Sequence, residues 1–546
     1  MAQQNPINSV QWLTVRPSGK TANYVSGDKL EFDLPREISF IDGRQSYIYV
    51  EVENNSTQAS APTANYPACW YSHVGASGML QRVQLQDLNG RMLEDVEQAN
   101  AYLGVMNSYG KDQGEYDVMA KVEGVSGHDP SPFNSNCGDK NVNIMYPTGT
   151  YDPVAKTLTG GNKAVPTSYC LPVPLGLWSR LGNDHQVFPN LAFNGTKMNI
   201  YFEKPNVCMK DMSSKFVKDD GNQFFEANYV HATDEVACDD LAAPDDRDKV
   251  YLKKTVCDTG ATAYGEAFDL QNCVYRVGQA CVVTYTGGTL TTTISAIKDD
   301  QGSGSDQVEI TLAGSLPAGV VEDITFKLET PTLSYKINKI ELRVLVVMPN
   351  DPKPILSAVA KGINYNTTTL SKISTAAQLK NSVLNVVSSM TRASSIWVLP
   401  CNADKLETLN ESSIVYPQQD DANTTSYQWQ IKDFLIPNKE VLVDKLRNTD
   451  NDNSIYRQQL SMALRPVVPL KAYGCGDNPD ASDLSSPYVV GIQLAPLGNT
   501  FNLLENEPQL RYNNGSSVNT PARLYHVYVN HTRTVRSGEF GTEVMV

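Results

Sequence analysis

Residues 75–109, GASGMLQRVQLQDLNGRMLEDVEQANAYLGVMNSY, decide the fold. Side chains alternate along residues 79–88, which predicts a strand, and the Asn-Gly pair that follows favours a tight turn because both residues tolerate positive φ. Residues 91–96 then form the returning strand. From residue 97 to 106 the apolar side chains fall on one helical face, which predicts a short helix. A two-stranded ribbon cannot bury its apolar face alone, so the chain must supply further strands around it.

The composition favours a large β-rich protein. The chain has 546 residues, enough for two or more domains, and its 41% hydrophobic and 19% charged residues are typical of a globular protein. Its 27 tyrosines, 36 glycines and 30 prolines favour many short strands joined by turns. Long blocks with helical periodicity are missing from the sequence.

The net charge of −15 argues against a nucleic-acid-binding protein, because an acidic surface repels phosphate backbones. The first residues, MAQQNPINSVQWL, carry neither a basic segment nor an apolar run, so we predict no secretory signal peptide. No stretch approaches the roughly 18–20 apolar residues of a membrane span. We expect a protein that is made in a reducing compartment or released by lysis.

The ten cysteines are scattered without a CxxC pair, and the six histidines do not cluster with them. This pattern predicts no zinc site. One or two disulfides remain open, because several cysteines lie between residues 208 and 281. We expect most of the cysteines to be free, buried thiols.

The first half of the chain has the pattern of a series of short strands. Residues 1–27 are polar, contain two prolines and show no periodicity, so we predict an extended arm that is disordered or held by a neighbour. A long connection at residues 110–167 is typical of loops that make contacts. The further predicted strands lie at residues 30–34, 44–53, 170–174, 187–193 and 197–202, with a helical turn at residues 176–181.

Residues 206–330 differ in character from the rest of the chain. The segment begins with dense acidic residues and continues with short strands rich in threonine and valine. A Gly-Gly pair at residues 287–288 predicts a hairpin between two of these strands. We predict a small all-β insertion that stands off a larger domain, with strands at residues 274–276, 281–286, 289–297, 307–312 and 320–328.

The strongest strand pattern is SYKINKIELRVLVVM, residues 334–348, and the proline-rich segment at 350–354 ends it. We place a domain boundary there. The second half repeats the layout of the first, including a helix at residues 455–464 after a ribbon. Its predicted strands lie at residues 363–370, 381–388, 394–401, 426–434, 488–494 and 523–530.

Many short strands, long loops and a repeated layout favour two β-sandwiches in tandem. The jelly roll is the sandwich that accommodates long connections at its ends. We therefore predict an all-β protein made of two tandem jelly rolls (a double jelly roll) with long loops and a β-rich insertion. The predicted domains are an arm at 1–27, a first jelly roll at 28–350 with the insertion at about 206–330, and a second jelly roll with the C-terminal tail at 351–546.

Familiar catalytic and binding motifs are missing from the sequence. The GASG and YTGGT segments lack the lysine or further glycine of a phosphate-binding loop, and no GxSxG, HExxH or EF-hand pattern occurs. The acidic pairs at residues 239–240 and 245–246 could bind a divalent ion, although a solvated acidic loop is the commoner meaning of such pairs.

Packing explains the side chains that could otherwise act in catalysis. His526 and His531 are five residues apart on or beside one strand and so point to opposite faces. Glu94 and Asp95 also face opposite sides of a strand, which is the wrong geometry for two carboxylates that share a substrate. We therefore predict no catalytic, cofactor-binding or metal-binding residues and no enzyme. Core positions are more common than sugar-stacking positions for the tryptophans of a sandwich, here Trp70, Trp178, Trp397 and Trp429.

Several segments resemble the double jelly-roll major capsid proteins of polinton-like viruses and virophages, which belong to the PRD1–adenovirus structural lineage. Their order and spacing along the chain carry the resemblance more than any one of them. The insertion at about 206–330 has no counterpart in the resemblance. The segments are GASGMLQRVQLQDLNGRMLEDVEQANAYL (75–103), YCLPVPLGLWSRLGNDHQVFPNLAF (169–193), YKINKIELRVLVV (335–347), SYQWQIKDFLIP (426–437) and SIYRQQLSMAL (454–464).

The resemblance implies a structural protein without cofactors. Three copies would form a homotrimeric, hexon-like capsomer of six jelly rolls, and capsomers would tile an icosahedral shell around a double-stranded DNA genome. The arm at 1–27 and the tail SGEFGTEVMV (537–546) would lie inside and tie neighbouring copies together. The implied partners are neighbouring capsomers, penton proteins and minor capsid or cement proteins, with outer loops that could touch the host surface. The implied location is the virion, assembled inside the infected cell.

Two other classes of protein remain open from the residues. A carbohydrate-binding adhesin or lectin-like sandwich would use tryptophan or tyrosine to bind sugar, and it should be secreted. A glycoside hydrolase on a β-sandwich needs two facing carboxylates, which the sequence does not place.

Overall fold

The hairpin and helix predicted from the central stretch are confirmed in the computed structural model. Leu80–Asp87 (β5) pairs antiparallel with Met92–Glu97 (β6), and the helix Ala99–Gly110 (α1) follows. Their apolar side chains are buried, so the unit lies inside a larger core. The structure describes residues 7–20, 22–64, 66, 68–70, 74–110, 115, 118, 122–125, 144–145, 150–152, 155, 157–159, 166–179, 187–211, 214–217, 228–231, 235–238, 247–257, 273, 275–300, 307–320, 323–377, 381–403, 425–442, 451–466, 489–494, 500–514, 522–538 and 541–545.

The two strands of this hairpin and six further strands form a first jelly roll. One sheet has the order β1-β21-β3-β10 and the facing sheet has the order β2-β11-β5-β6. Counted from first to eighth along the chain, the strands follow the orders 1-8-3-6 and 2-7-4-5, the two-sheet arrangement of a jelly roll. The other strands are β1 (Ile7–Val15), β2 (Lys29–Pro35), β3 (Ile41–Asn54), β10 (Thr167–Pro172), β11 (Gly195–Phe202) and β21 (Tyr335–Pro349).

The second half repeats this arrangement strand for strand, so the predicted double jelly roll is confirmed. Its sheets have the orders β22-β29-β24-β27 and β23-β28-β25-β26, again 1-8-3-6 and 2-7-4-5. The helix Asn451–Leu464 (α7) follows the fifth strand, as α1 does in the first half, and Lys353–Lys361 (α6) links the halves. The strands are β22 (Ile363–Thr375), β23 (Asn381–Asn385), β24 (Ala393–Asn402), β25 (Thr425–Ile431), β26 (Phe434–Leu442), β27 (Val490–Gln493), β28 (Pro508–Asn514) and β29 (Arg523–Gly538).

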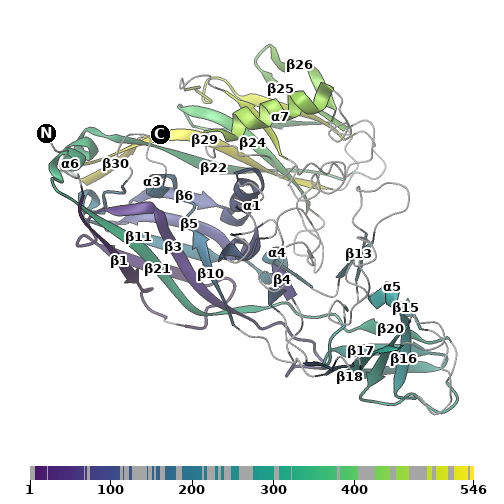
Figure 1. Ribbon diagram of the computed structural model, residues 1–546. Helices are drawn as coiled ribbons and strands as arrows, with labels where there is room; N and C mark the ends of the chain where they lie inside the picture. Colours follow the sequence, from purple (N-terminus) through teal and green to yellow (C-terminus); the bar gives the residue numbers. More distant parts are fainter. Residues whose placement is uncertain are drawn as a thin grey trace.

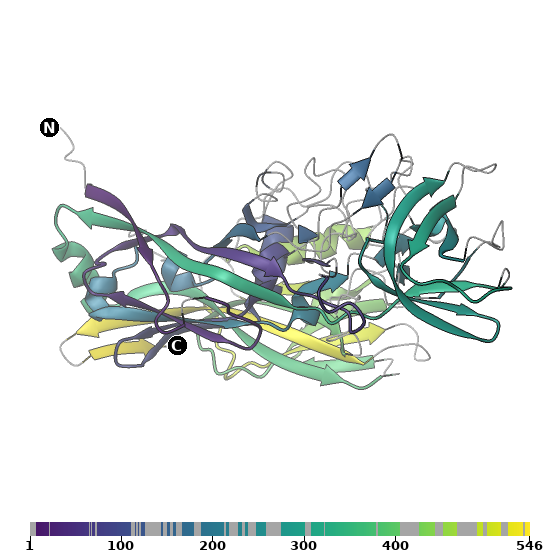
Figure 2. The ribbon, with the colours of Figure 1, turned by 90° about the horizontal axis from the view of Figure 1, so that it is seen from below.

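A smaller β domain lies between the seventh and eighth strands of the first jelly roll. It stands off one end of the molecule (Figures 1 and 2) and has a hydrophobic core of its own. The Gln58 side chain ties it to the first jelly roll, since the amide donates to the carbonyl oxygen of Ala280 at 2.9 Å and accepts from the Ala280 N–H at 2.7 Å. Its strands are β15 (Val236–Ala237), β16 (Lys249–Lys253), β17 (Ala280–Tyr285), β18 (Gly288–Asp300), β19 (Gln307–Leu312) and β20 (Thr325–Leu328), joined by β8 (Thr150–Asp152) and β9 (Thr157–Thr159).

Short elements complete the described part of the chain. They are the three-stranded sheet of β4 (Ala68–Trp70), β7 (Ile144–Met145) and β12 (Met209–Asp211), the hairpin of β13 (Ser214–Val217) and β14 (Asn228–His231), and the strand β30 (Gly541–Met545). The helices are η1 (Gly75–Met79), α3 (Gly176–Ser179), η2 (Asn190–Phe193), α4 (Pro205–Cys208) and α5 (Lys254–Cys257). None of the helices within these described ranges is long and apolar enough to cross a bilayer.

Both chain ends differ from expectation. Within the predicted arm, residues 7–15 form β1, which pairs along its length with β21. Within the predicted tail, β30 folds back and pairs with β29, so these residues extend a sheet of their own chain. The Thr542 carbonyl oxygen also accepts a hydrogen bond from the Arg91 guanidinium, which ties this hairpin to the first jelly roll.

Two predicted strands are wrong. At residues 187–193, Phe188 makes an isolated bridge and η2 follows, because the Asn190 amide donates to the carbonyl oxygens of Pro35 and Ile38 at 2.9 and 2.8 Å and holds the segment in a turn. At residues 274–276, Arg276 and its predecessor lie outside any strand, since the Arg276 side chain caps a nearby carbonyl oxygen, that of Tyr275, at 2.9 Å. The acidic pairs at 239–240 and 245–246 lie outside the described residues.

Candidate functional site: the junction between the jelly rolls

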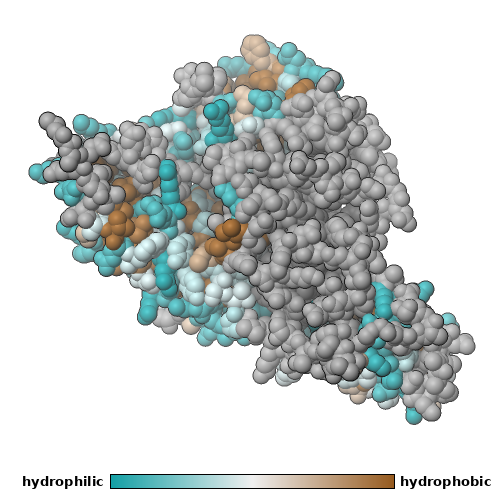
Figure 3. All heavy atoms as spheres, in the orientation of Figure 1, coloured by the Kyte–Doolittle hydropathy of each residue, from teal (hydrophilic) through white to brown (hydrophobic). Residues whose placement is uncertain are grey.

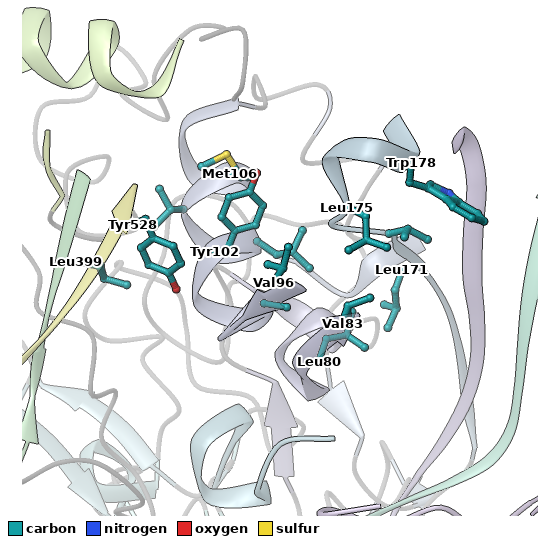
Figure 4. Packing of buried hydrophobic residues seen from close by; sticks show 14 of the residues in the cluster. Leu80, Val83, Val96, Tyr102, Met106, Leu171, Leu175, Trp178, Leu399 and Tyr528 are labelled. Carbon is teal, nitrogen blue, oxygen red and sulfur yellow. The ribbon is translucent and has the colours of Figure 1, made fainter. Parts of the chain in front are cut away.

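The two jelly rolls share one continuous hydrophobic core. On the first jelly roll, β6 and α3 lie against β22 of the second. In Figure 4, Tyr528 of β29 lies between Leu399 of β24 and Tyr102 of α1. We call this contact the junction. Its central residues are Glu94, Tyr102, Gly176, Tyr365, Thr367, Trp397 and Tyr528.

An aromatic cluster fills one half of the junction. The Trp397 and Tyr528 rings stack with centroids 3.9 Å apart and planes inclined by 13°. The Tyr102 ring of the first jelly roll lies 6.2 Å from each of the other two centroids. The Tyr528 hydroxyl donates to the Gln98 carbonyl oxygen at 3.2 Å, and burial raises the pKa of Tyr528, which keeps this hydroxyl a neutral donor. Such aromatic pairs add about 0.5–1.5 kcal/mol beyond the area that they bury.

A buried carboxylate occupies the other half of the junction. Glu94 of β6 is fully buried. The backbone N–H groups of Gly176 and Leu177 donate to its two oxygens at 2.8 and 2.7 Å. The Thr367 hydroxyl of β22 donates to the same carboxylate at 2.5 Å. Glu94 therefore joins two separate segments of the first jelly roll to the first strand of the second.

The Glu94 carboxyl group is enclosed by its hydrogen-bond donors and is not exposed to solvent. Burial raises the pKa of Glu94 above its ordinary value, while the hydrogen bonds to it and the positive charge of Arg533 act in the opposite direction. The three groups that hydrogen-bond to the carboxylate are all donors, so the site suits a group with two acceptor oxygens. Loss of a buried acceptor of this kind lowers the free energy of unfolding, because each buried donor left without a hydrogen bond costs about 1–3 kcal/mol. The site therefore serves to fix one jelly roll against the other.

Backbone contacts make the junction close-packed beside Glu94. The Tyr365 hydroxyl of β22 donates to the Leu93 carbonyl oxygen at 2.5 Å. A Cβ atom added at Gly176 would lie 1.8 Å from the carbonyl oxygen of Asn366 in β22. Only a residue without a side chain fits where these two backbones meet.

The structure tests the positions predicted from the sequence for two carboxylates and four tryptophans. Glu94 and Asp95 face opposite sides of β6 as predicted, and Asp95 lies on the partly exposed side, where it accepts from the Arg82 Nε at 2.8 Å. The predicted core position of the tryptophans is confirmed for all four, Trp70, Trp178, Trp397 and Trp429. Sequence reasoning missed the role of Glu94 at the junction. The available signal was a carboxylate on the inward side of a strand whose neighbours are apolar.

His526 and His531 are buried on β29, and each is held neutral. Burial lowers the pKa of His526 to about 3 and that of His531 to about 4. The His531 Nδ1 lies 3.0 Å from the Val529 carbonyl oxygen, and its Nε2 accepts from the Arg533 Nε at 3.0 Å. Because one ring nitrogen donates and the other accepts, protonation would set two donors against each other.

Protonation of the two histidines should therefore lower the stability of the fold at mildly acidic pH. The folded-state pKa values of both histidines are depressed, so their contribution is complete above about pH 6.5 and is lost as the pH falls toward 4. At pH 5 the expected loss is about 2 kcal/mol for each histidine. Glu94 and Glu203, whose pKa values burial raises, act in the opposite sense over an overlapping pH range, so a histidine variant is needed to isolate the contribution of the histidines.

Urea titrations of the wild type and of His531→Gln between pH 7 and pH 5 would test this expectation. The variant should start less stable at pH 7 and lose less stability on acidification. Parallel pH profiles for the two proteins would contradict the assignment to His531.

Within the residues that the structure describes, no group of three or more histidine, cysteine, aspartate or glutamate side chains is arranged to hold a metal ion. Cys208, Cys281 and Cys401 are buried, and burial raises the pKa of each of these thiols. Thiols with raised pKa values are poor nucleophiles. These three thiols are part of the hydrophobic cores.

Comparison with known proteins gives structural neighbours only. No protein-family model matches the chain, and no curated protein is similar to it in sequence. The major capsid protein of mavirus is 10% identical, with a TM-score of 0.45 over 100% of this chain and 92% of that chain. The Faustovirus major capsid protein is 8% identical, with a TM-score of 0.47 over 98% of this chain and 92% of that chain. A chain of the PBCV-1 virus capsid is 9% identical, with a TM-score of 0.44 over 100% of this chain and 98% of that chain.

Proposed function

We propose that this chain is a viral major capsid protein, a structural protein that assembles with copies of itself into an icosahedral shell around a double-stranded DNA genome. The observation that carries the proposal is the duplication. One chain contains the same eight-strand order twice, and a continuous buried core fuses the two jelly rolls into one body. The resemblance of five separated sequence segments to double jelly-roll capsid proteins agrees with it.

The physical properties of the fused pair suit a shell component. Each jelly roll pairs most of its strand edges internally, which limits uncontrolled edge-to-edge association at high local concentration. The junction fixes the angle between the jelly rolls through buried hydrogen bonds and aromatic packing. A rigid unit with two similar walls can present the same kind of contact at regular intervals. In a homotrimer, three such units would supply the six walls of a pseudo-hexagonal capsomer.

The remaining parts of the chain have roles within the same proposal. The β domain at one end of the molecule (Figure 2) would form the outer tower and touch the host surface. Neighbouring capsomers, penton proteins and minor capsid or cement proteins of the same virus would be the partners, and the virion would be the location. The chain would have no catalytic role.

The sugar-binding alternative loses the four tryptophans considered for it in the sequence. Trp70, Trp178, Trp397 and Trp429 are all fully buried, so none of them offers a stacking surface to a sugar.

The first test is the mass of the purified protein in solution, combined with negative-stain images of the same sample. The proposal predicts a species near 180 kDa, three times the chain mass of 60.0 kDa, with hexagonal outlines. A protein that stays at 60.0 kDa at high concentration would rule out the capsomer.

A further inference from the structure

The fifth strands of the two jelly rolls are equivalent in the fold but not in their surroundings. Each lies at the edge of its sheet, in the orders β2-β11-β5-β6 and β23-β28-β25-β26. In β6 the second and third residues, Leu93 and Glu94, are buried beneath β22. In β26 the second and third residues, Leu435 and Ile436, are 37% and 36% exposed, and Phe434 before them is 73% exposed. Figure 3 shows the resulting apolar surface at the top of the molecule, over β25 and β26.

The first strands of the two jelly rolls, β1 and β22, also differ in burial. The third and fifth residues of β22, Tyr365 and Thr367, are buried because they cover β6. In β1 a bulge between Ile7 and Ser9 shifts the alternation by one residue, so that Val10 and Trp12 take the corresponding outward positions. Val10 is 53% exposed and Trp12 is 50% exposed.

The outward position of Trp12 follows from its neighbours along β1. Leu13 and Val15 pack against the core, so the residues between and before them point away from it. The Trp12 ring lies 5.8 Å from that of Tyr47 on the adjoining part of the sheet. This sheet face therefore carries two neighbouring aromatic rings, and that of Trp12 is half-exposed.

We propose that the β1 face of one copy covers β26 of a second copy, and so repeats between copies the contact that β22 makes with β6 within one chain. This inference rests on the proposed function and names the surfaces that would join the trimer. The two surfaces lie on opposite sides of the pair of jelly rolls (Figure 1), so the contact is head to tail. A head-to-tail contact forms a closed ring when the rotation between copies permits it. Each copy leaves an apolar strand edge uncovered when alone, and the next copy covers it.

Two charged substitutions test the surfaces one at a time. Trp12→Glu and Phe434→Glu each replace an exposed side chain, so thermal melting should show that both variants fold. Each should shift the species near 180 kDa to one near 60.0 kDa by light scattering. Leu504→Glu is the matched control, because Leu504 is 66% exposed and apolar but lies outside both surfaces, and it should remain a trimer.

A mixture of the two variants tests whether the contact is head to tail. The Phe434→Glu copy keeps an intact β1 face, and the Trp12→Glu copy keeps an intact β26 edge. One intact contact can therefore form between them, and an equimolar mixture should give a species near 120 kDa, twice 60.0 kDa, without a closed trimer.

The possible failures are separable. A wild-type protein that is monomeric would overturn the proposed function. A wild-type trimer that both variants leave intact would overturn only the assignment of these surfaces. Variants that are each monomeric and remain at 60.0 kDa when mixed would overturn the head-to-tail geometry.

Discussion

Replacing Glu94 with alanine is expected to destabilise the protein by roughly 3–5 kcal/mol. The substitution removes the acceptor of the Gly176 and Leu177 N–H groups and of the Thr367 hydroxyl at this buried position. Each abandoned donor costs about 1–3 kcal/mol, and part of that cost is recovered because the buried charge is also removed. Urea denaturation followed by tryptophan fluorescence would measure the loss.

Glu94→Gln gives an intermediate case that tests the acceptor argument. The amide keeps one acceptor oxygen but turns its NH₂ group toward a donor, so the expected loss is about 1–3 kcal/mol. Asp95→Asn is the matched control one residue away. Asp95 lies on the partly exposed side of β6 with Arg82, so its loss should cost less than about 1 kcal/mol.

The shape of the unfolding curve provides a second measure. If Glu94 couples the jelly rolls, weakening the junction should broaden the wild-type transition or split it into two. A Glu94→Ala protein within 1 kcal/mol of the wild type, with one sharp transition, would contradict the role assigned to the carboxylate.

The sequence predicted the fold well wherever one face of a strand is apolar and the other is polar. The β5–β6 hairpin, β19 and β21 were found because their alternation is regular and clear turn or break signals bound them. The β1 strand was missed for a physical reason. Its inward Leu13 and Val15 alternate with outward Val10 and Trp12, so apolar residues lie on both faces and the alternation disappears.

The junction could not be predicted from the sequence. The partners of Glu94 lie 82 and 273 residues further along the chain, at Gly176 and Thr367. No local pattern links residues at such separations, and a carboxylate in a strand is usually solvated. The duplication could be predicted because it is a property of order along the chain. The contact between the duplicated units is a property of their packing in space.

The same reasoning makes Gly176 a position of the junction that does not tolerate a methyl group. In Gly176→Ala the new Cβ would lie 1.8 Å from the Asn366 carbonyl oxygen and 2.9 Å from its carbon. Both atoms are backbone of β22, so no side chain can rotate to relieve the overlap. β22 cannot retreat without breaking the hydrogen bond from Thr367 to Glu94, and α3 cannot retreat without breaking those from Gly176 and Leu177.

The expected loss for Gly176→Ala is at least about 3 kcal/mol, the upper range for an overpacked core. Gly538→Ala is the matched control, because nothing lies within 4 Å of a Cβ added there and its φ is outside the left-handed region. That substitution should be neutral or slightly stabilising, since alanine reduces the conformational freedom of the unfolded chain. Opposite signs for the two alanines would locate the cost in the contact between the jelly rolls. Similar small effects would mean that the two backbones can separate at Gly176 at little cost, and the junction would then be too compliant to set the angle between the jelly rolls.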